Sequence, residues 1–294
     1  MNDLSKKDIL HVLSVAEASK RQPKPAILNG RVLGSCFFEP STRTRLSFET
    51  AMLRLGGSVI GFADPSVTST KKGETLADTT KIVSQYADAI VIRHHLEGAA
   101  RRAAEAVDIP VINAGDGGNQ HPTQALIDLY TIKACQKKVD GLQIAIVGDL
   151  KYGRGIHSLV QILKHFSVRL YFVAPEAVQL PDAFRDELKY HQIKFSLHEN
   201  FEGLIPKLDI LYLIRMQEER FSDRLEYERL KHAFFLKTSA LVNAKKSLRI
   251  LHIMPRVYEM DTQIDQTPYA YYFEQAKNGL YIRQALLGLV LGKL

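Results

Sequence analysis

Residues 32–55, VLGSCFFEPSTRTRLSFETAMLRL, decide the fold of this chain. Residues 32–38 form a short and mostly apolar run, which predicts a strand buried within a sheet. Residues 46–55 carry apolar side chains at helical spacing, which predicts an amphipathic helix. A buried strand that leads directly into such a helix is the building unit of a parallel α/β sheet.

The same alternation continues on the C-terminal side of this stretch. Further strands are predicted at 58–62, 89–92 and 111–114, and helices at 76–86, 97–107 and 123–134. After the polar stretch 137–141 a second series begins, with a helix at 155–166 and strands at 143–148, 169–174, 209–214 and 249–253. Residues 270–294 are predicted to form two helices that separate near Asn278-Gly279. We therefore expect an α/β fold of two tandem doubly wound domains with mainly parallel sheets.

The composition is that of an ordinary folded protein. Of the 294 residues, 46% are apolar and 24% are charged, which argues against disorder. Cys36 and Cys135 lie in apolar surroundings, so we expect buried thiols rather than a disulfide or a metal-binding pair. The N-terminal residues show no signal-peptide pattern, and the apolar stretch 285–292 is too short to span a bilayer. We expect a cytoplasmic protein without a membrane partner.

The net charge of +7 indicates an anionic ligand. The basic residues do not form a block; instead they are scattered through turns and loops, as Arg43, Arg93 and Arg215 are. The sequence has no zinc-finger or RNA-recognition signature. Scattered arginines favour a small anion over a nucleic-acid backbone.

The segment Glu39-Pro40-Ser41-Thr42-Arg43-Thr44-Arg45 has the residue types of a phosphate site. The N–H groups at the start of a helix point toward an incoming anion, and hydroxyl and guanidinium groups add further donors. The sequence contains no G-x-x-x-x-G-K-[ST], so this is not a Walker loop. The alternative is a capped helix with surface arginines. A cap needs only one Ser or Thr, whereas this segment has three hydroxyls and two arginines, so we favour the phosphate site.

Other polar groups also follow predicted strands. Ligands of open α/β sheets bind beyond the carboxyl ends of the strands, so we expect a ligand to contact Arg93, His121, Gln124, Arg154 and Arg215. His121-Pro122 opens a helix, and a histidine and a glutamine can bond a carbonyl or an amide. Residues 148–155 lack the G-x-G-x-x-G pattern of dinucleotide sites. Residues 68–75 are interpreted as a mobile loop with basic residues.

These groups together resemble the catalytic chains of the aspartate carbamoyltransferase family, and the resemblance covers about residues 4–291. Residues 37–45, FFEPSTRTR, look like the carbamoyl-phosphate signature of all carbamoyltransferases, and residues 121–124, HPTQ, belong to the same set. Three stretches of this chain resemble the elements that are specific to the aspartate enzymes of the family: 72–75 (KGET), 148–154 (GDLKYGR) and 215–217 (RMQ). An ornithine enzyme would have an S-M-G loop and an H-C-L-P motif, whereas this chain has His252-Ile253-Met254-Pro255.

The resemblance implies a role for each of these residues. Carbamoyl phosphate is expected to bind Ser41, Thr42, Arg43, Thr44, Arg93, His121, Gln124 and the backbone carbonyls of Met254 and Pro255. Of these, the catalytic residues are expected to be Arg43, Thr44, Arg93, His121 and Gln124. Aspartate is expected to bind Lys72, Arg154, Arg215 and Gln217. A neighbouring subunit of a homotrimer is expected to supply Lys72 together with Ser69 or Thr68. Glu39 is expected to bridge Arg154 and Arg220 when the domains close.

The resemblance also implies the domain roles and the reaction. Residues 1–135, completed by about 273–294, would bind carbamoyl phosphate, and residues 140–272 would bind aspartate, with the C-terminal helix packing back on the first domain. The aspartate amine would attack the carbamoyl carbon directly, giving N-carbamoyl-L-aspartate and phosphate in the second step of de novo pyrimidine synthesis. We expect no covalent intermediate, no cofactor and no metal, because the sequence has neither an activated nucleophile nor Cys/His metal spacing.

Three alternatives remain open from the sequence: an ornithine carbamoyltransferase, a non-catalytic carbamoyltransferase-like scaffold subunit, and a nucleic-acid-binding protein. Arg215 and Gln217 favour a dicarboxylate acceptor over ornithine. The complete set of arginines argues against a scaffold that has lost activity. The sequence does not decide whether a separate regulatory chain is a partner.

Overall fold

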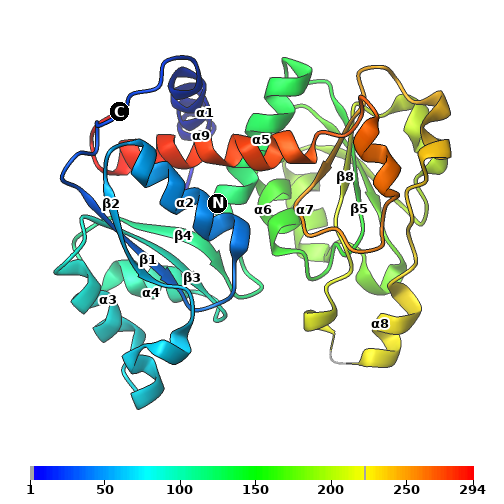
Figure 1. The fold of residues 1–294 in the computed structure, drawn as a ribbon. Coiled ribbons are helices and arrows are strands. Elements are labelled where there is room, and N and C mark those ends of the chain that lie inside the picture. The colour runs from blue at the N-terminus through cyan, green and yellow to red at the C-terminus, as the bar shows by residue number, and fades with distance from the viewer. Residues whose placement is uncertain (1–2, 222) are drawn as a thin grey trace. The chain divides into compact units, whose positions relative to one another are not determined.

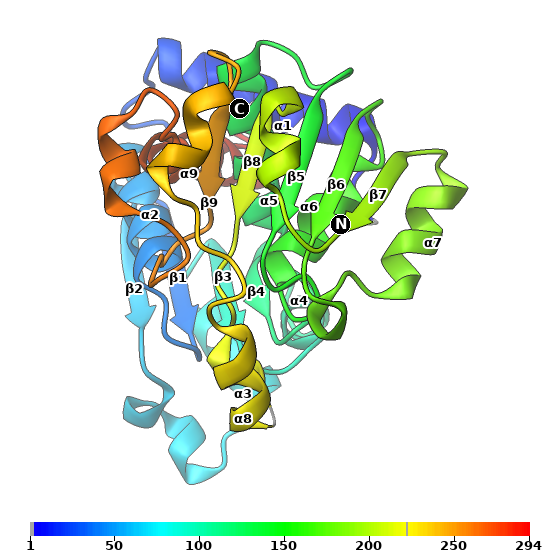
Figure 2. The same ribbon diagram turned by 90° about the vertical axis from the view of Figure 1, so that its right-hand side faces the viewer.

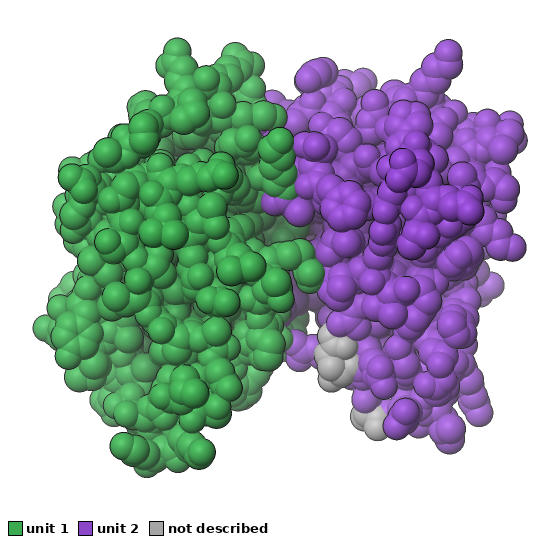
Figure 3. All heavy atoms as spheres, viewed as in Figure 1, with its two compact units in different colours: residues 1–127, 277–294 green, residues 128–276 purple. Residues whose placement is uncertain are grey.

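The computed structural model describes residues 3–221 and 223–294 and is drawn as a ribbon in Figure 1. The chain divides into two compact units, which Figure 3 colours separately. Unit 1 extends to Ile127 and includes Lys277–Leu294, and unit 2 is Asp128–Ala276. Helices α5 (Pro122–Gln136) and α9 (Tyr272–Val290) each begin in one unit and end in the other.

Unit 1 contains a four-stranded parallel sheet in the order β2-β1-β3-β4. Besides parts of α5 and α9, its elements are α1 (Lys6–Arg21), β1 (Val32–Phe37), α2 (Thr42–Arg54), β2 (Ser58–Phe62), α3 (Leu76–Ser84), β3 (Ala89–His94), α4 (Ala99–Glu105) and β4 (Val111–Asp116). Figure 1 shows α2 on one face of this sheet and α3 and α4 on the other.

Side-chain alternation along the strands explains why both faces of the unit 1 sheet are covered. Leu33 and Phe37 of β1 belong to the same buried core as Phe48 of α2. Cys36 belongs to a second core with Ala103 of α4. Successive side chains of a strand point to opposite faces, so a nearly continuous apolar run needs helices on both sides. The doubly wound α/β arrangement that the sequence predicts is confirmed.

Unit 2 contains a five-stranded parallel sheet in the order β7-β6-β5-β8-β9, whose strands lie side by side in Figure 2. Its elements are β5 (Gln143–Val147), α6 (Arg154–Leu163), β6 (Arg169–Val173), α7 (Asp182–Tyr190), β7 (Lys194–His198), β8 (Ile210–Leu213), α8 (Arg224–Leu230) and β9 (Arg249–His252). Strand β7 lies at one edge, and its residues are half-buried or exposed. Strand β7 was not predicted, because the other strands were recognised by continuous apolar runs. Its alternation of Phe195 and Leu197 with polar residues is the pattern of a half-buried edge strand.

The prediction of two C-terminal helices is wrong, because α9 is one continuous helix over Tyr272–Val290. Asn278 is buried in it, and a Cβ on Gly279 would lie 3.2 Å from Cδ1 of Ile127. Glycine inside a helix costs only about 1 kcal/mol, so here it permits close packing without ending the helix. The end of α9 packs on unit 1 as expected, because Leu287 belongs to the core of β1 and α2.

One further prediction needs correction. Helix α2 begins at Thr42 rather than at residue 46, so Ser41 is its N-cap and Thr42, Arg43, Thr44 and Arg45 form its first turn. Residues 68–75, interpreted as a mobile loop with basic residues, contain a 3-10 helix over Ser69–Lys72 that the Thr68 side chain caps.

The two thiols differ in burial, and the described helices are either short or not strongly apolar. Cys36 is buried and Cys135 is half-buried, and both are free. Burial raises the pKa of the Cys36 thiol to about 12. Within the described ranges, we find no helix whose length and apolar content would let it cross a membrane.

Candidate active site

In unit 1 the predicted phosphate residues lie where the strand order of the sheet reverses. From β1 the chain passes to β2 on one side, and β3 pairs with β1 on the other, with Phe37 opposite Arg93. In open α/β sheets, ligands bind at such a switch point, beyond the carboxyl ends of the strands. The start of α2 and the end of β3 therefore face the same edge of the sheet.

The start of α2 is built to receive an anion. Ser41 is the N-cap residue, yet its side chain makes no capping hydrogen bond within the described chain, and the first turn contains no acidic residue. Arg43 and Arg45 lie in that turn, where the helix macrodipole disfavours a positive charge. An anion bound at the helix start would satisfy the N–H groups and lie beside the Arg43 guanidinium, whereas Arg45 already forms an ion pair with Glu49 at 3.1 Å.

Thr44 and His121 lie together in unit 1. Thr44 Oγ1 is 3.5 Å from His121 Nε2, and both residues are about 5% exposed. His121 directly precedes α5, and its carbonyl accepts the N–H groups of Gln124 and Ala125. Two residues 77 apart in the sequence thus place polar groups at one point of the unit 1 sheet.

The buried carboxylate of Asp116 shapes the loop that leads to His121. It accepts the Gly98 N–H at 2.8 Å and side-chain N–H groups of Asn113 at 2.8 Å and Asn119 at 3.0 Å. The sequence analysis assigned no role to Asp116. An aspartate between glycines and asparagines after a strand is the only sequence signal for such a turn.

Arg93 forms an ion pair within unit 1. Its Nε lies 3.4 Å from Oε2 of Glu39, and both side chains are mostly buried. Glu39 also raises the pKa of the neighbouring His94, but burial and the charge of His95 outweigh it and lower that pKa. The sequence analysis placed Arg93 at this edge of the sheet and did not foresee its pairing with Glu39.

The predicted aspartate residues of unit 2 lie at the switch point of the second sheet. Strands β5 and β8 are neighbours, with Val147 opposite Leu213, and β6 lies on the other side of β5. The loop after β5 leads to Arg154, and the loop after β8 carries Arg215 and Gln217. The two loops therefore start side by side at the carboxyl edge.

Asp149 joins these two loops. It is fully buried, and its carboxylate accepts the Tyr152 N–H at 2.9 Å and the Gln217 N–H at 3.3 Å. The loops also approach closely at Gly148, where a Cβ would lie 1.9 Å from the carbonyl oxygen of Ile214. Asp149 lies within the stretch 148–154 that resembles the family. Its role could not be predicted from the sequence, because Gln217, whose N–H it accepts, lies 68 residues away.

Arg154 and Arg215 are held in different ways. Arg154 is the first residue of α6 and is only 8% exposed, although a helix start disfavours a buried cation. Arg215 is half-buried and donates from Nη1 to the Met216 carbonyl at 3.0 Å. Both guanidinium groups suit a carboxylate, which they can bind through two parallel hydrogen bonds.

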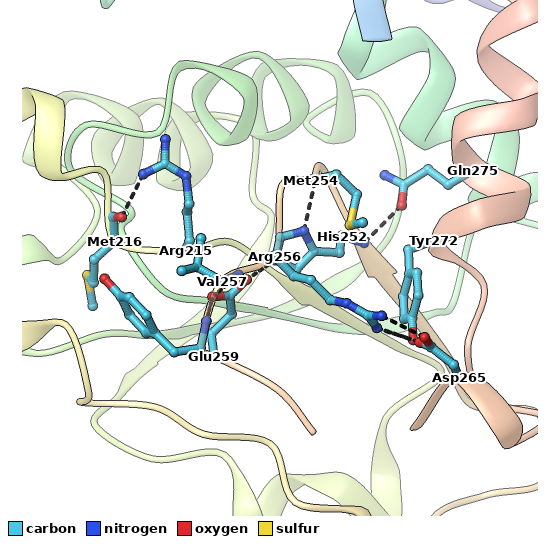
Figure 4. Close-up of polar contacts among 11 residues, drawn as sticks. Arg215, Met216, His252, Met254, Arg256, Val257, Glu259, Asp265, Tyr272 and Gln275 are labelled. Carbon is cyan, nitrogen blue, oxygen red and sulfur yellow. Dashed lines mark hydrogen bonds and ion pairs between the residues drawn. The ribbon is translucent and has the colours of Figure 1, made fainter. Parts of the chain in front are cut away.

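A further polar cluster follows β9 in unit 2 (Figure 4). Arg256 forms a bidentate ion pair with Asp265, at 2.5 and 2.6 Å, and also donates to the Tyr272 hydroxyl at 3.2 Å. The Arg256 guanidinium holds the pKa of the Asp265 carboxyl below its usual value. Met254 and Pro255 are half-buried and exposed, respectively, in the same loop.

The residues expected from a neighbouring subunit lie apart from these clusters in the sequence and are accessible. Ser69 and Lys72 are exposed on the 3-10 helix between β2 and α3. The Thr68 hydroxyl donates to the Pro65 carbonyl at 2.7 Å and lies 2.6 Å from Thr70 Oγ1.

Arg220 ends a short 3-10 turn after Gln217. In residues 3–221 and 223–294, no three His, Cys, Asp or Glu side chains gather as a metal site would require.

Comparison with known proteins identifies the family. Residues 1–134 match the family described as aspartate/ornithine carbamoyltransferase, carbamoyl-P binding domain, and residues 140–290 match its Asp/Orn binding domain. The chain is 54% identical over 292 residues to aspartate carbamoyltransferase catalytic subunit 2 of Shewanella halifaxensis, covering 99% of this chain and 94% of the relative.

Solved structures of relatives support the same family. The catalytic subunit of M. jannaschii aspartate transcarbamoylase is 47% identical with a TM-score of 0.91, covering 99% of this chain and 96% of that one. Aspartate transcarbamoylase from Trypanosoma cruzi, in complex with carbamoyl phosphate and aspartate, is 36% identical with a TM-score of 0.91, covering 97% and 94%. The chain therefore belongs to the aspartate/ornithine carbamoyltransferase family, and within it to the aspartate carbamoyltransferase catalytic subunits.

Proposed function

We propose that this chain transfers the carbamoyl group of carbamoyl phosphate to the amine of L-aspartate, giving N-carbamoyl-L-aspartate and phosphate. One observation carries the proposal: in each sheet, an arginine in the first turn of a helix lies at the switch point, Arg43 in α2 and Arg154 in α6. The Trypanosoma cruzi relative, whose structure contains carbamoyl phosphate and aspartate, supports this choice of substrates. The reaction is the second step of de novo pyrimidine synthesis, which we place in the cytoplasm.

Unit 1 binds carbamoyl phosphate in this proposal. The phosphate lies at the start of α2, on the N–H groups and on Ser41, Thr42 and Arg43. The carbonyl oxygen of the carbamoyl group accepts hydrogen bonds from Thr44, Arg93 and His121. The proximity of Thr44 to His121 supports a common acceptor for the two side chains. The carbamoyl amide donates to Gln124 and to the backbone carbonyls of Met254 and Pro255.

Unit 2 binds aspartate in this proposal, through Arg154, Arg215 and Gln217. The bridge that Asp149 forms between their two loops supports a single carboxylate-binding surface. Closure of the domains adds a bridge from Glu39 to Arg154 and Arg220, for which Glu39 gives up its present pairing with Arg93. Arg93 is then released toward the carbamoyl oxygen.

The chemistry needs no group beyond these residues. The aspartate amine attacks the carbamoyl carbon, and negative charge develops on the carbonyl oxygen, where Thr44, Arg93 and His121 stabilise it. The carbon–oxygen bond to phosphate then breaks, and the departing phosphate takes the proton that the attacking amine loses. Arg43 with the α2 N-terminus stabilises this leaving group. Holding both anions side by side converts a bimolecular encounter into a single oriented step.

The amine acceptor is tested by assaying carbamoylation of aspartate and of ornithine in parallel. Carbamoyl aspartate is expected as the only carbamoylated product, since two guanidinium groups suit a dicarboxylate. Carbamoylation of ornithine, or no product at all, would overturn the proposal; the second outcome would point to a scaffold subunit.

A homotrimer completes each site in this proposal, with Lys72 and Ser69 entering from the neighbouring subunit. We choose Ser69 over Thr68 because the Thr68 hydroxyl already caps its own turn.

Mixing a Lys72→Ala chain with an Arg43→Ala chain tests whether neighbouring subunits share residues of one site. Partial activity is expected in the hybrid, because some sites receive both native residues. A mixture that assembles but has no activity contradicts the sharing.

A further inference from the structure

A single imidazole holds the loop that follows β9. His252 Nδ1 accepts the backbone N–H of Met254 at 2.7 Å, and His252 Nε2 lies 2.7 Å from Oε1 of Glu259 (Figure 4). A ring nitrogen that accepts a hydrogen bond carries no proton. The proton of this neutral ring is therefore on Nε2, which donates to Glu259, and the tautomer is fixed by its two partners.

Glu259 keeps the ring in this tautomer. Its carboxylate is buried and also accepts the N–H groups of Val257 at 3.1 Å and Tyr258 at 3.0 Å. Burial raises the pKa of Glu259, but hydrogen bonds from His252 and from the backbone outweigh this and leave the pKa below its usual value. An ionised carboxylate can only accept, so Nε2 must donate to it and Nδ1 must remain the acceptor.

The conformation of Met254 depends on that acceptor. Its φ is +60°, in the left-handed region that side chains other than glycine rarely adopt. Such a backbone persists only where the surroundings hold it. The ring is itself anchored, because the His252 N–H donates to Gln275 Oε1 at 2.9 Å, and Gln275 Nε2 donates to the buried Asp128 at 2.7 Å.

We propose that His252 is a positioning residue that sets the selectivity for a carbamoyl group over an acetyl group. Its Nδ1 fixes the Ile253–Met254 peptide and so holds Met254 at its φ of +60°, and this backbone conformation sets the direction of the Met254 carbonyl and of the Pro255 carbonyl after it. This inference rests on the proposed function, in which those carbonyls accept the N–H groups of the carbamoyl amide. Acetyl phosphate has a methyl group at that position and cannot donate to them. A correctly aimed pair of carbonyls therefore favours carbamoyl phosphate.

Two substitutions of His252 distinguish the role of Nδ1 from the role of Nε2. In His252→Asn, the amide oxygen lies where Nδ1 was and can accept the N–H two residues later, as in an Asx turn. In His252→Gln, the longer side chain can still donate to Glu259 but presents no acceptor to Met254. His191→Gln is the matched control, because His191 is exposed at the end of α7. The quantity measured is the KM for carbamoyl phosphate divided by the Ki for acetyl phosphate.

We expect His252→Gln to raise that ratio roughly tenfold to a hundredfold, since the half-buried Met254 N–H loses its acceptor. His252→Asn should restore most of the selectivity, and His191→Gln should not change it. A ratio in His252→Gln within about twofold of the unsubstituted chain, or equal losses in both His252 variants, would overturn the inference. An unsubstituted chain that does not discriminate between the two phosphates would instead refute the proposed site at Met254 and Pro255.

Glu259→Ala provides the test if His252→Gln does not fold. Alanine removes the acceptor of the Nε2 proton, so no carboxylate keeps the proton on Nε2 and Nδ1 as the acceptor. The Met254 N–H then loses its fixed acceptor, so the same loss of selectivity is expected. Retained selectivity in Glu259→Ala would overturn the role of the His252 tautomer.

Discussion

Replacing Asp149 with asparagine should selectively weaken the use of aspartate. The native carboxylate accepts the N–H groups of Tyr152 and Gln217 while fully buried, and so ties the loop that leads to Arg154 to the loop that carries Arg215. Asparagine has one oxygen and one NH2 group, so at least one of these backbone donors faces another donor.

The magnitude follows from the loss of one hydrogen bond to a buried charged group. Such a bond contributes about 1.5–3 kcal/mol, and an unsatisfied buried donor costs a similar amount. If this free energy is lost from the binding of the transition state, kcat/KM for aspartate falls roughly tenfold to 150-fold. The KM for carbamoyl phosphate should change far less, because none of the residues proposed to bind it lies in these two loops.

Initial rates with each substrate varied in turn measure this effect, and thermal unfolding monitors the fold. Asp140→Asn is the matched control, because Asp140 is exposed and accepts the Ser167 N–H at 2.7 Å. We expect the control to retain native kinetics. The reasoning is refuted if Asp149→Asn lowers the melting temperature but leaves kcat/KM for aspartate within about threefold of the native value. Asp149 would then support the fold alone.

Three further predictions follow from the structure. Thr44→Val keeps the side-chain shape and removes a proposed donor to the carbamoyl oxygen, so steady-state kinetics should show kcat reduced roughly a hundredfold; a change below about threefold would contradict the role. Gly148→Ala places a Cβ against the Ile214 carbonyl at a φ of +127°, so chemical denaturation should show a loss of about 3 kcal/mol or more, and near-native stability would contradict the close approach. Burial lowers the pKa of His157 below 6.5, so the unfolded chain binds more protons as the pH falls below that value and the free energy of unfolding decreases. His157→Gln, which can still donate to the Leu150 carbonyl, should lose less stability between about pH 7 and about pH 5, and an unchanged slope in thermal unfolding would contradict this assignment.

The local sequence by itself determined the type of most helices and strands and the polar residues that follow the strands. An apolar run of 32–38 before a helical repeat specifies a strand and a helix, because side-chain spacing and turn chemistry act over only a few residues. The same local information placed Arg93, His121, Arg154 and Arg215 after strands, and parallel strands bring their carboxyl ends to one edge. It misjudged Asn278-Gly279, where tertiary packing outweighs the weak helix propensity of these residues.

Only the tertiary structure decided which residues hold the site in place. Strand order put β1 beside β3 and β5 beside β8, and this created the two switch points. Asp149 reaches Gln217 across 68 residues, and Asp128 reaches Gln275 across 147. A buried carboxylate is stable only when donors surround it, and the donors from Gln217 and Gln275 belong to segments that meet through folding rather than through sequence proximity. The roles of Asp149 and His252 therefore became visible only in the folded chain.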